Sequence, residues 1–147
     1  MYVVTVEAAG ERAGCLVGFA SQCSIRPPRF MVWLSKLNHT FDVARSASHL
    51  AVHVLGRDQR ALAELFGGET GERVDKFAQV AWRHSSDGSP VLTGACAWFV
   101  GGIEGQVQGG DHVGFLLAPT EQSPPLDCRP ALLRYSDVKD LEPGHPA

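Results

Sequence analysis

The chain lacks the features of several large protein classes. It has no apolar run near the roughly 20 residues that cross a bilayer. It does not begin with a basic segment followed by an apolar core, so we expect no signal peptide. A formal net charge of −3 gives no basic face of the kind that binds nucleic acid. These absences favour a cytoplasmic protein with neither membrane nor nucleic acid among its partners.

Disulfide and nucleotide-binding motifs are also missing. The four cysteines are Cys15, Cys23, Cys96 and Cys128. They are scattered and form no C-x-x-C pair, which is typical of reduced cysteines in a cytosolic protein. No G-x-G-x-x-G follows a predicted strand, so the sequence contains no Rossmann dinucleotide site.

Two histidines, His49 and His53, have the spacing of a metal site on a helix. The apolar residues of segment 50–55 instead predict a strand, on which side chains at that separation are too far apart to share a metal easily. We therefore expect structural roles for both histidines and predict no metal site.

The 147 residues and 44% hydrophobic content suit one domain with a sizeable core, since typical domains hold about 100–150 residues. Helices are predicted at 40–47, with Thr40 as the N-cap, and at 58–66. The predicted strands are 2–7, 14–24, 29–34, 50–55, 80–84, 95–100, 103–107, 112–118 and a short last one at 131–135. Turns are predicted at 9–12, 85–88 and 101–102, and a loop at 119–130. This mostly β pattern favours an antiparallel barrel, closed to remove its edges.

The stretch from residue 14 to residue 40 is the richest in chemistry. Small polar residues at 21–24 precede Pro27 and Pro28, an apolar run follows, and a second polar cluster occupies 35–40. A buried strand that delivers hydroxyls, an amide and one cation to its end suits an anionic ligand with a polar ring edge. Charge-assisted hydrogen bonds from such groups hold phosphates well.

The order of motifs along the chain resembles the flavin reductase-like family of FMN-binding split β-barrels. Each motif is weak alone, but they occur in the family's order between residues 2 and 118. The matching segments are 23–28 (C-S-I-R-P-P), 35–40 (S-K-L-N-H-T), 52–55 (V-H-V-L), 59 with 62–66, 75–77 (D-K-F), 88–92 (G-S-P-V-L) and 110–112 (G-D-H). The chain departs from the family at Leu116, where a Gly is expected, and at 16–18, where Leu-Val-Gly replaces Thr-Ala-Ser.

The resemblance implies an FMN-binding split β-barrel, mostly β and Greek-key-like, with two or three short helices. It implies a homodimer with the flavin near the subunit interface. The domain would comprise residues 1–118, with 119–147 a loop, a short strand and a loose tail of the same domain. The implied activity is that of an NAD(P)H-dependent flavin reductase, in which the nucleotide binds transiently and passes a hydride to the flavin. The implied partner is a flavin-dependent monooxygenase.

The resemblance also implies roles for single residues. His112 is the catalytic candidate, since in the family this histidine faces the approach of the nicotinamide. It would orient the pyridine nucleotide or supply a proton, because the ordinary pKa of histidine lies near neutral pH. The expected cofactor-binding residues are Phe19, Ala20, Ser21, Gln22, Cys23 and Ser24 at the ring, Ser35, Lys36, Asn38 and Thr40 at the phosphate and ribityl chain, and Phe77 near the ligand.

Plainer interpretations stay open for each residue. They are an ordinary strand end at 21–24, a helix cap at Thr40, a solvated Lys36, a core position for Phe77 and a strand histidine paired with Asp111 at His112. The functional alternatives are a flavin carrier or sensor without turnover, and a split barrel that uses FAD, deazaflavin F420 or haem. A reductase requires an open face above the flavin near His112, whereas a carrier would cover that face.

Overall fold

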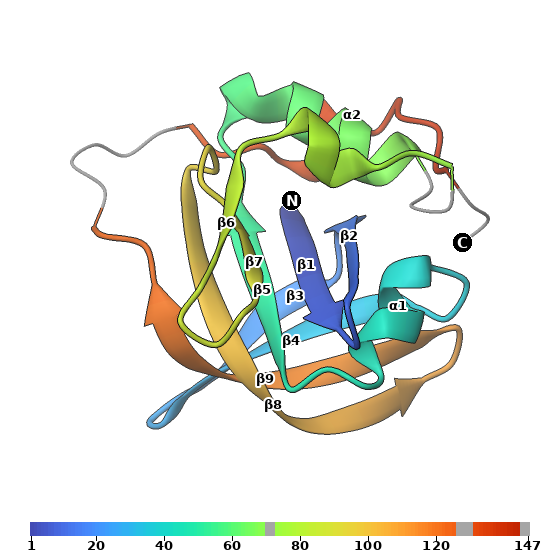
Figure 1. The fold of residues 1–147 in the computed structure, drawn as a ribbon. Coiled ribbons are helices and arrows are strands. Elements are labelled where there is room, and N and C mark those ends of the chain that lie inside the picture. The colour runs from blue at the N-terminus through green and yellow to red at the C-terminus, as the bar shows by residue number, and fades with distance from the viewer. Residues whose placement is uncertain (70–72, 126–130, 145–147) are drawn as a thin grey trace.

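Seven strands form one antiparallel sheet in the computed structural model, which describes residues 1–69, 73–125 and 131–144 (Figure 1). The sheet order is β2-β1-β5-β8-β9-β4-β3. Its strands are β1 (Tyr2–Ala8), β2 (Glu11–Val17), β3 (Ala20–Ile25), β4 (Pro28–Ser35), β5 (His49–Val54), β8 (Ala97–Gly109) and β9 (His112–Gln122). A separate hairpin pairs β6 (Trp82–His84) with β7 (Pro90–Leu92). The helices are α1 (His39–Ala44) and α2 (Arg60–Gly68), with short 3-10 turns at Arg57–Gln59, Lys76–Gln79 and Tyr135–Asp137.

The two edge strands of the sheet are consecutive in the chain. β2 pairs with β1 and β3 pairs with β4, and only Gly18 and Phe19 separate them. The Phe19 carbonyl accepts a hydrogen bond of 2.9 Å from the Trp33 amide, so the chain has already changed pairing partner at that point. The predicted single strand over 14–24 is therefore wrong. The split-barrel class is confirmed, but β2 and β3 do not pair with each other, and the sheet is not closed by hydrogen bonds.

The main core consists of side chains on the inner face of β1 and of its neighbouring strands, where successive side chains point to opposite faces. Val4 and Val6 face inward from β1, and they meet Val52 of β5 and Phe115 of β9, all fully buried. A second buried cluster lies under α2, where Phe66 packs with residues that include Val3, Leu55 and Leu133. The inner faces of the strands thus bury one core, and α2 covers a second core at one end of the sheet.

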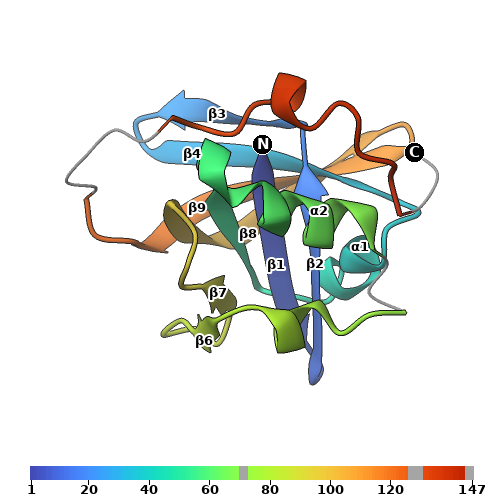
Figure 2. The same ribbon diagram turned by 90° about the horizontal axis from the view of Figure 1, so that it is seen from above.

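The C-terminal strap, defined as residues 131–144, crosses this end of the sheet next to α2 (Figures 1 and 2). Four backbone hydrogen bonds of the described residues hold it there. They run from Arg57 N to Ala131 O, from Leu133 N to Leu55 O, from Gly144 N to Gly67 O and from the N-terminal ammonium of Met1 to Leu133 O. The predicted strand at 131–135 is wrong, because the strap makes a single β-bridge, between Leu132 and Gly56.

Other differences from the sequence prediction have local causes. Gly101 and Gly102, predicted as a turn, lie inside β8, and a Cβ on Gly101 would stand 2.8 Å from the Leu117 Cβ. Glycine here permits close approach of β9 at a register shift rather than a reversal of the chain. β9 continues to Gln122, so the loop predicted from residue 119 begins later, and residues 126–130 lie outside the described part. No helix among the described residues is both long and apolar enough to cross a bilayer.

His53 joins the hairpin of β6 and β7 to the main sheet. Its ring is fully buried, with Nδ1 2.9 Å from the Val3 carbonyl oxygen and Nε2 2.9 Å from the Leu92 amide nitrogen. Because the Leu92 amide can only donate, Nε2 must accept and Nδ1 carries the proton. Burial lowers the pKa of His53 to about 4, so the ring is neutral at pH 7. The predicted structural role of this histidine is confirmed.

Candidate functional site

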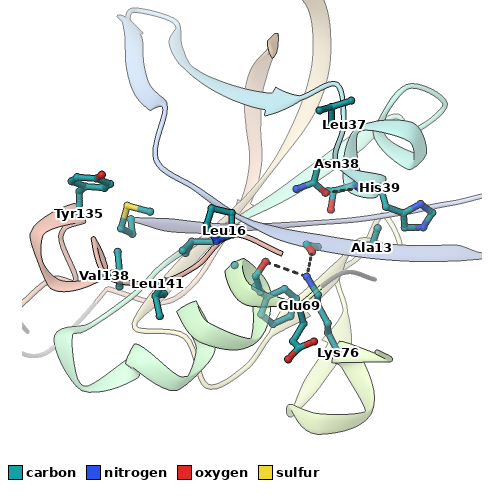
Figure 3. Close-up of a pocket in the computed structure, with 16 residues that line it drawn as sticks. Ala13, Leu16, Leu37, Asn38, His39, Glu69, Lys76, Tyr135, Val138 and Leu141 are labelled. Atoms are coloured by element: carbon teal, nitrogen blue, oxygen red, sulfur yellow. Dashed lines mark hydrogen bonds between the residues drawn. The ribbon is translucent and has the colours of Figure 1, made fainter. Parts of the chain in front are cut away.

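Two adjoining cavities open between the sheet, α2 and the strap. The strand chamber, about 400 Å³, lies against the end of β2, the link to β3 and the end of β4. The strap chamber, about 320 Å³, lies between α1, α2 and the strap (Figure 3). Both are lined by Met1, Leu16, Asn38, Tyr135 and Pro143. The shared wall makes the two chambers parts of one groove.

The strand chamber is mostly apolar, with polar groups at one side. Phe19 and Trp33 contribute aromatic walls, and Ser35 and His112 contribute the polar groups. Ser35 and His112 are direct partners across β4 and β9, which explains why two residues far apart in sequence meet there. The ring of Phe19 meets that of His112 edge to face, with 5.3 Å between centroids. Of the predicted residues, the structure brings Phe19, Ser35, Asn38 and His112 to this chamber.

His112 is held by the residue before it. Its Nδ1 lies 2.8 Å from Asp111 Oδ1, and this hydrogen bond lowers the pKa of the Asp111 carboxyl. The Asp111 carbonyl also accepts a hydrogen bond from the Lys36 amide, which ties the β8–β9 turn to the end of β4. The carboxylate therefore orients the imidazole, leaving Nε2 as the ring nitrogen that can reach a ligand.

The polar segment 35–40 satisfies much of its own hydrogen bonding. Ser35 Oγ accepts from the Leu37 amide at 3.3 Å, and Asn38 Oδ1 accepts from the Thr40 amide at 2.9 Å. Asn38 is thus the N-cap of α1, and the prediction that Thr40 caps this helix is wrong by two residues. The side-chain oxygen of an asparagine at the N-cap accepts a hydrogen bond from the first helical N–H groups as well as a hydroxyl oxygen does.

Thr40 is buried and Lys36 is exposed, and their predicted shared role at a phosphate stays a prediction. Thr40 is 1% exposed on the wall of the strap chamber, and its hydroxyl is hydrogen-bonded to the thiol of Cys15. Burial raises the pKa of that thiol to about 11, so Cys15 is neutral and not a nucleophile at pH 7. The Lys36 side chain is exposed and lines neither chamber, as expected of a solvated lysine.

The predicted ring-binding residues of β3 lie outside both chambers. Ser21, Gln22 and Cys23 are exposed on this edge strand. The Gln22 amide donates to the Ser24 carbonyl at 3.0 Å, and the Ser24 hydroxyl donates to the Pro27 carbonyl at 2.7 Å. Ala20, at the start of the strand, packs against the core. Ser21, Gln22, Cys23 and Ser24 line neither chamber as formed by the described residues, and their predicted contact with a flavin stays a prediction.

Phe77 is a core residue. It is 6% exposed and packs edge to face against Phe66 and Trp82, with centroid distances of 5.9 and 5.7 Å. It lines neither chamber. The ring therefore packs in the second core under α2, and its predicted ligand contact stays a prediction.

Lys76 precedes Phe77 in the same D-K-F motif, and no role of its own was predicted for it. Its Nζ is buried on the floor of the strap chamber, 3.2 Å from the Gly14 carbonyl oxygen and 3.1 Å from that of Phe66 (Figure 3). Burial lowers the pKa of Lys76. The ammonium joins β2 to the end of α2, and it gives the chamber a cation sheltered from water.

We expect Lys76→Met to lower the free energy of unfolding by about 2 kcal/mol, because two buried carbonyl oxygens lose their donor while the apolar stem is kept. Urea denaturation followed by circular dichroism measures this change. Lys36→Met is the matched control, since Lys36 is exposed and its replacement is expected to stay within about 0.5 kcal/mol. Equal effects of the two substitutions would contradict a structural role for Lys76.

The residues that line the groove fit a flavin. A flat aromatic ring needs apolar walls, which Leu16, Phe19 and Trp33 provide, and polar partners along one edge, which Ser35 and Asn38 provide. The strand chamber lies within the range of about 300–1,000 Å³ that is usual for ligand sites.

Comparison with known proteins decides the family. The model of the family described as flavin reductase like domain matches residues 1–138. The chain belongs to the flavin reductase-like domain family. It is 32% identical over 114 residues to a Rhizobium meliloti protein named "Probable flavin reductase", with 75% of this chain and 36% of that protein covered. The chain therefore spans little more than a third of that relative.

Two further relatives agree with this membership. The reductase subunit HsaB of a flavin-dependent monooxygenase from Mycobacterium tuberculosis is 29% identical over 133 residues, covering 86% of this chain and 70% of that one. The solved structure of the Streptomyces globisporus NADH:FAD oxidoreductase SgcE6 superimposes with a TM-score of 0.76 at 28% identity, covering 83% of this chain and 72% of that one. The predicted family and fold are thus confirmed.

Proposed function

We propose that the protein is an NAD(P)H-dependent flavin reductase that holds the flavin ring in the strand chamber. The observation that carries the proposal is the chamber itself, an apolar slot with Ser35 and Asn38 on its polar side and His112 at its mouth. The family membership and the names of the relatives support the same activity.

When bound, the flavin supplies an acceptor for the hydride that leaves C4 of the nicotinamide, so the protein needs no acid or base of its own for that transfer. The partly buried side chains of Leu16 and Trp33 give the ring apolar walls. His112, oriented by Asp111, positions the incoming nucleotide by its free ring nitrogen. The residues therefore bind and align the two reactants.

A recess beside His112 favours a reductase over a carrier. It holds about 270 Å³ and is lined by Phe19, Trp33, Gly109, Asp111 and His112. Phe19 and Trp33 also line the strand chamber, so the recess adjoins the proposed flavin site. Phe19 is 65% exposed, so this face is open in the single chain. An open face is what transient binding of NADH or NADPH requires, whereas a carrier would cover it.

We propose further that the protein is a cytoplasmic homodimer that passes reduced flavin to a flavin-dependent monooxygenase. The free edge of β3 and the exposed side chain of Ile25, 79% accessible, support an interface there. An interface at β3 would also give Ser21 to Ser24 their predicted flavin contacts. The monooxygenase partner is supported by the name of the Mycobacterium relative. Residues 1–118 and 119–147 are proposed to act as one domain.

We expect His112→Ala to lower kcat/KM for NADH oxidation about tenfold, since a loosely held nicotinamide reacts poorly. Flavin affinity should change less than about threefold, because the ring sits deeper in the chamber. Stopped-flow reduction and fluorescence titration measure the two quantities. His84→Ala serves as the control, because His84 is exposed and pairs with Glu7 away from the groove. Loss of flavin affinity with unchanged hydride transfer would make His112 a cofactor ligand instead.

A further inference from the structure

The indole of Trp33 lies over two glycines of the neighbouring strands. Trp33 and Gly114 are direct partners across β4 and β9, and Gly109 is the last residue of β8. A Cβ on Gly114 would stand 3.0 Å from Cζ3 of the indole, and a Cβ on Gly109 would overlap the same atom. Neither position has room for a side chain unless the indole moves. The two glycines therefore leave the space that the six-membered ring of the indole fills.

The recess beside His112, of which this indole is one wall, suits a flat cation. Phe19 and Trp33 supply aromatic rings to it, and Asp111 and His112 supply polar groups. The hydrogen bond with His112 lowers the pKa of the Asp111 carboxyl, which is therefore negatively charged at pH 7. Among the described residues, no lysine or arginine lines the recess. The face of an aromatic ring attracts cations, and that of tryptophan attracts them best.

Of these groups, the indole is expected to act most strongly on a bound cation. The side chain of Asp111 is 73% exposed, and water and salt screen an exposed charge. Trp33 is partly buried, so less water competes for a cation that lies against its ring. The recess thus offers a sheltered aromatic face, with a weaker contribution from the carboxylate.

Hydride transfer from NADH or NADPH creates a cation of this shape. The dihydronicotinamide ring is neutral before the reaction. When its C4–H bond breaks, the hydride leaves for the flavin with both bonding electrons, and the nicotinamide ring becomes a positively charged pyridinium. This charge is partly developed in the transition state. A group that attracts the cation binds the transition state more tightly than the neutral reactant, and such a difference accelerates a reaction.

We propose that the indole of Trp33 is a catalytic group, which stacks on the nicotinamide ring and stabilises the positive charge that develops there. The inference rests on the proposed function, because it requires the flavin ring in the strand chamber and the nicotinamide in the recess. Trp33 lines both cavities, so it lies where the two rings must meet. The same contact makes the recess bind the oxidised nucleotide more tightly than the reduced one.

The binding preference is tested without turnover by isothermal titration calorimetry of the FMN-loaded protein. The two probes are NAD⁺ and tetrahydro-NAD, an analogue whose nicotinamide ring is neutral and donates no hydride. We expect the unmodified protein to bind NAD⁺ about fivefold more tightly than the analogue. Trp33→Leu should weaken NAD⁺ about fivefold and change the affinity for the analogue less than about twofold. Trp33→Phe should lie between, because phenylalanine offers cations a weaker ring face.

Gly114→Ala tests the same contact without altering a residue that lines the recess or the strand chamber. Its Cβ would stand 3.0 Å from the indole and 2.9 Å from the sulfur of Met31, so the indole must shift. We expect NAD⁺ to bind about threefold more weakly, and we expect no further loss when Gly114→Ala is added to Trp33→Leu. Gly105→Ala is the matched control, since Gly105 is a glycine of β8 whose Cβ would meet nothing within 4 Å. Its NAD⁺ affinity should equal that of the unmodified protein.

Stopped-flow reduction of the bound FMN measures the catalytic part of the proposal. At saturating NADH, Trp33→Leu should lower the rate constant of hydride transfer about fivefold, while the KM for NADH changes less than about twofold. A wall that only shaped the recess would instead raise the KM and leave the rate constant unchanged. Gly105→Ala should retain both parameters.

The outcomes separate this proposal from the one on which it rests. An equal loss of affinity for NAD⁺ and tetrahydro-NAD in Trp33→Leu, or no loss of either, would overturn the role of the indole. A loss of FMN affinity in Trp33→Leu with the preference for NAD⁺ retained would assign Trp33 to the flavin alone and also overturn it. Bleaching by NADH without any preference for NAD⁺ removes only this proposal. If FMN binds but neither nucleotide does, and NADH does not bleach it, the proposed function itself fails.

Discussion

Acidification from pH 7 to pH 4 is expected to remove about 3 kcal/mol of stability through His53 alone. Burial in the folded state lowers the pKa of this histidine from its ordinary value of 6.5 to about 4. A tenfold change in proton affinity corresponds to about 1.4 kcal/mol. The native state binds fewer protons than the unfolded state between these two pH values, so the contribution is complete above about pH 6.5 and is lost as the pH falls toward 4.

The loss has a specific structural origin. Protonation places a second N–H on Nε2, where it meets the N–H of Leu92 donor against donor. Burial removes the water that would otherwise solvate the charge. The contact between β5 and the hairpin of β6 and β7 is therefore expected to fail first, since the hydrogen bond from Leu92 to His53 crosses it.

Urea denaturation of the protein and of His53→Gln at several pH values between 4 and 7.5 isolates this contribution. The variant should be less stable at pH 7 and should lose about 3 kcal/mol less on acidification, because it has no proton to take up at this site. His84→Gln, at an exposed histidine paired with Glu7, should follow the parent protein. A parallel pH profile for His53→Gln would contradict the account of His53.

Gly18→Trp is expected to weaken flavin binding about 100-fold, which is about 2.7 kcal/mol. Gly18 lines the strand chamber, and a Cβ built on it would lie 3.7 Å from the Met1 Cε, an ordinary contact on the chamber side. The substitution therefore directs an indole into the space proposed for the flavin ring. Folding should persist, because Gly18 is exposed and its Cβ position meets nothing closer.

Gly94→Trp provides the matched control. Gly94 is also exposed, a Cβ there would meet nothing within 4 Å, and the residue lines none of the described cavities. Fluorescence titration of both variants with FMN and FAD should show a loss in Gly18→Trp only. Tight flavin binding by a folded Gly18→Trp would show that the ring lies elsewhere.

The fold was predictable from the sequence wherever local pattern decides structure. The valine-rich composition of segment 2–7 predicted β1, and the continuous apolar run predicted β4. Prediction was wrong where a distant contact decides instead. The break at Gly18 exists because the chain changes partner from β1 to β4, and Gly101 stays extended because Leu117 of another strand packs over it. Neither contact is visible in a window of neighbouring residues.

The candidate site was likewise predictable only in part. Motif order led to Ser35, Asn38 and His112, which the structure places around one chamber. Nothing in the sequence assigned a role to Lys76 or Tyr135, because their importance depends on α2 and the strap meeting over β2, and no local pattern encodes that meeting. Phe77 stood in a recognisable motif, yet its ring serves the core.

The most direct test of the central claim is an anaerobic flavin titration followed by addition of NADH or NADPH, monitored by absorbance. The account predicts saturable binding of flavin to the purified protein and bleaching of its visible absorbance by one or both nucleotides. Bound flavin that neither nucleotide bleaches would point to a carrier. A protein that binds neither FMN nor FAD would contradict the account.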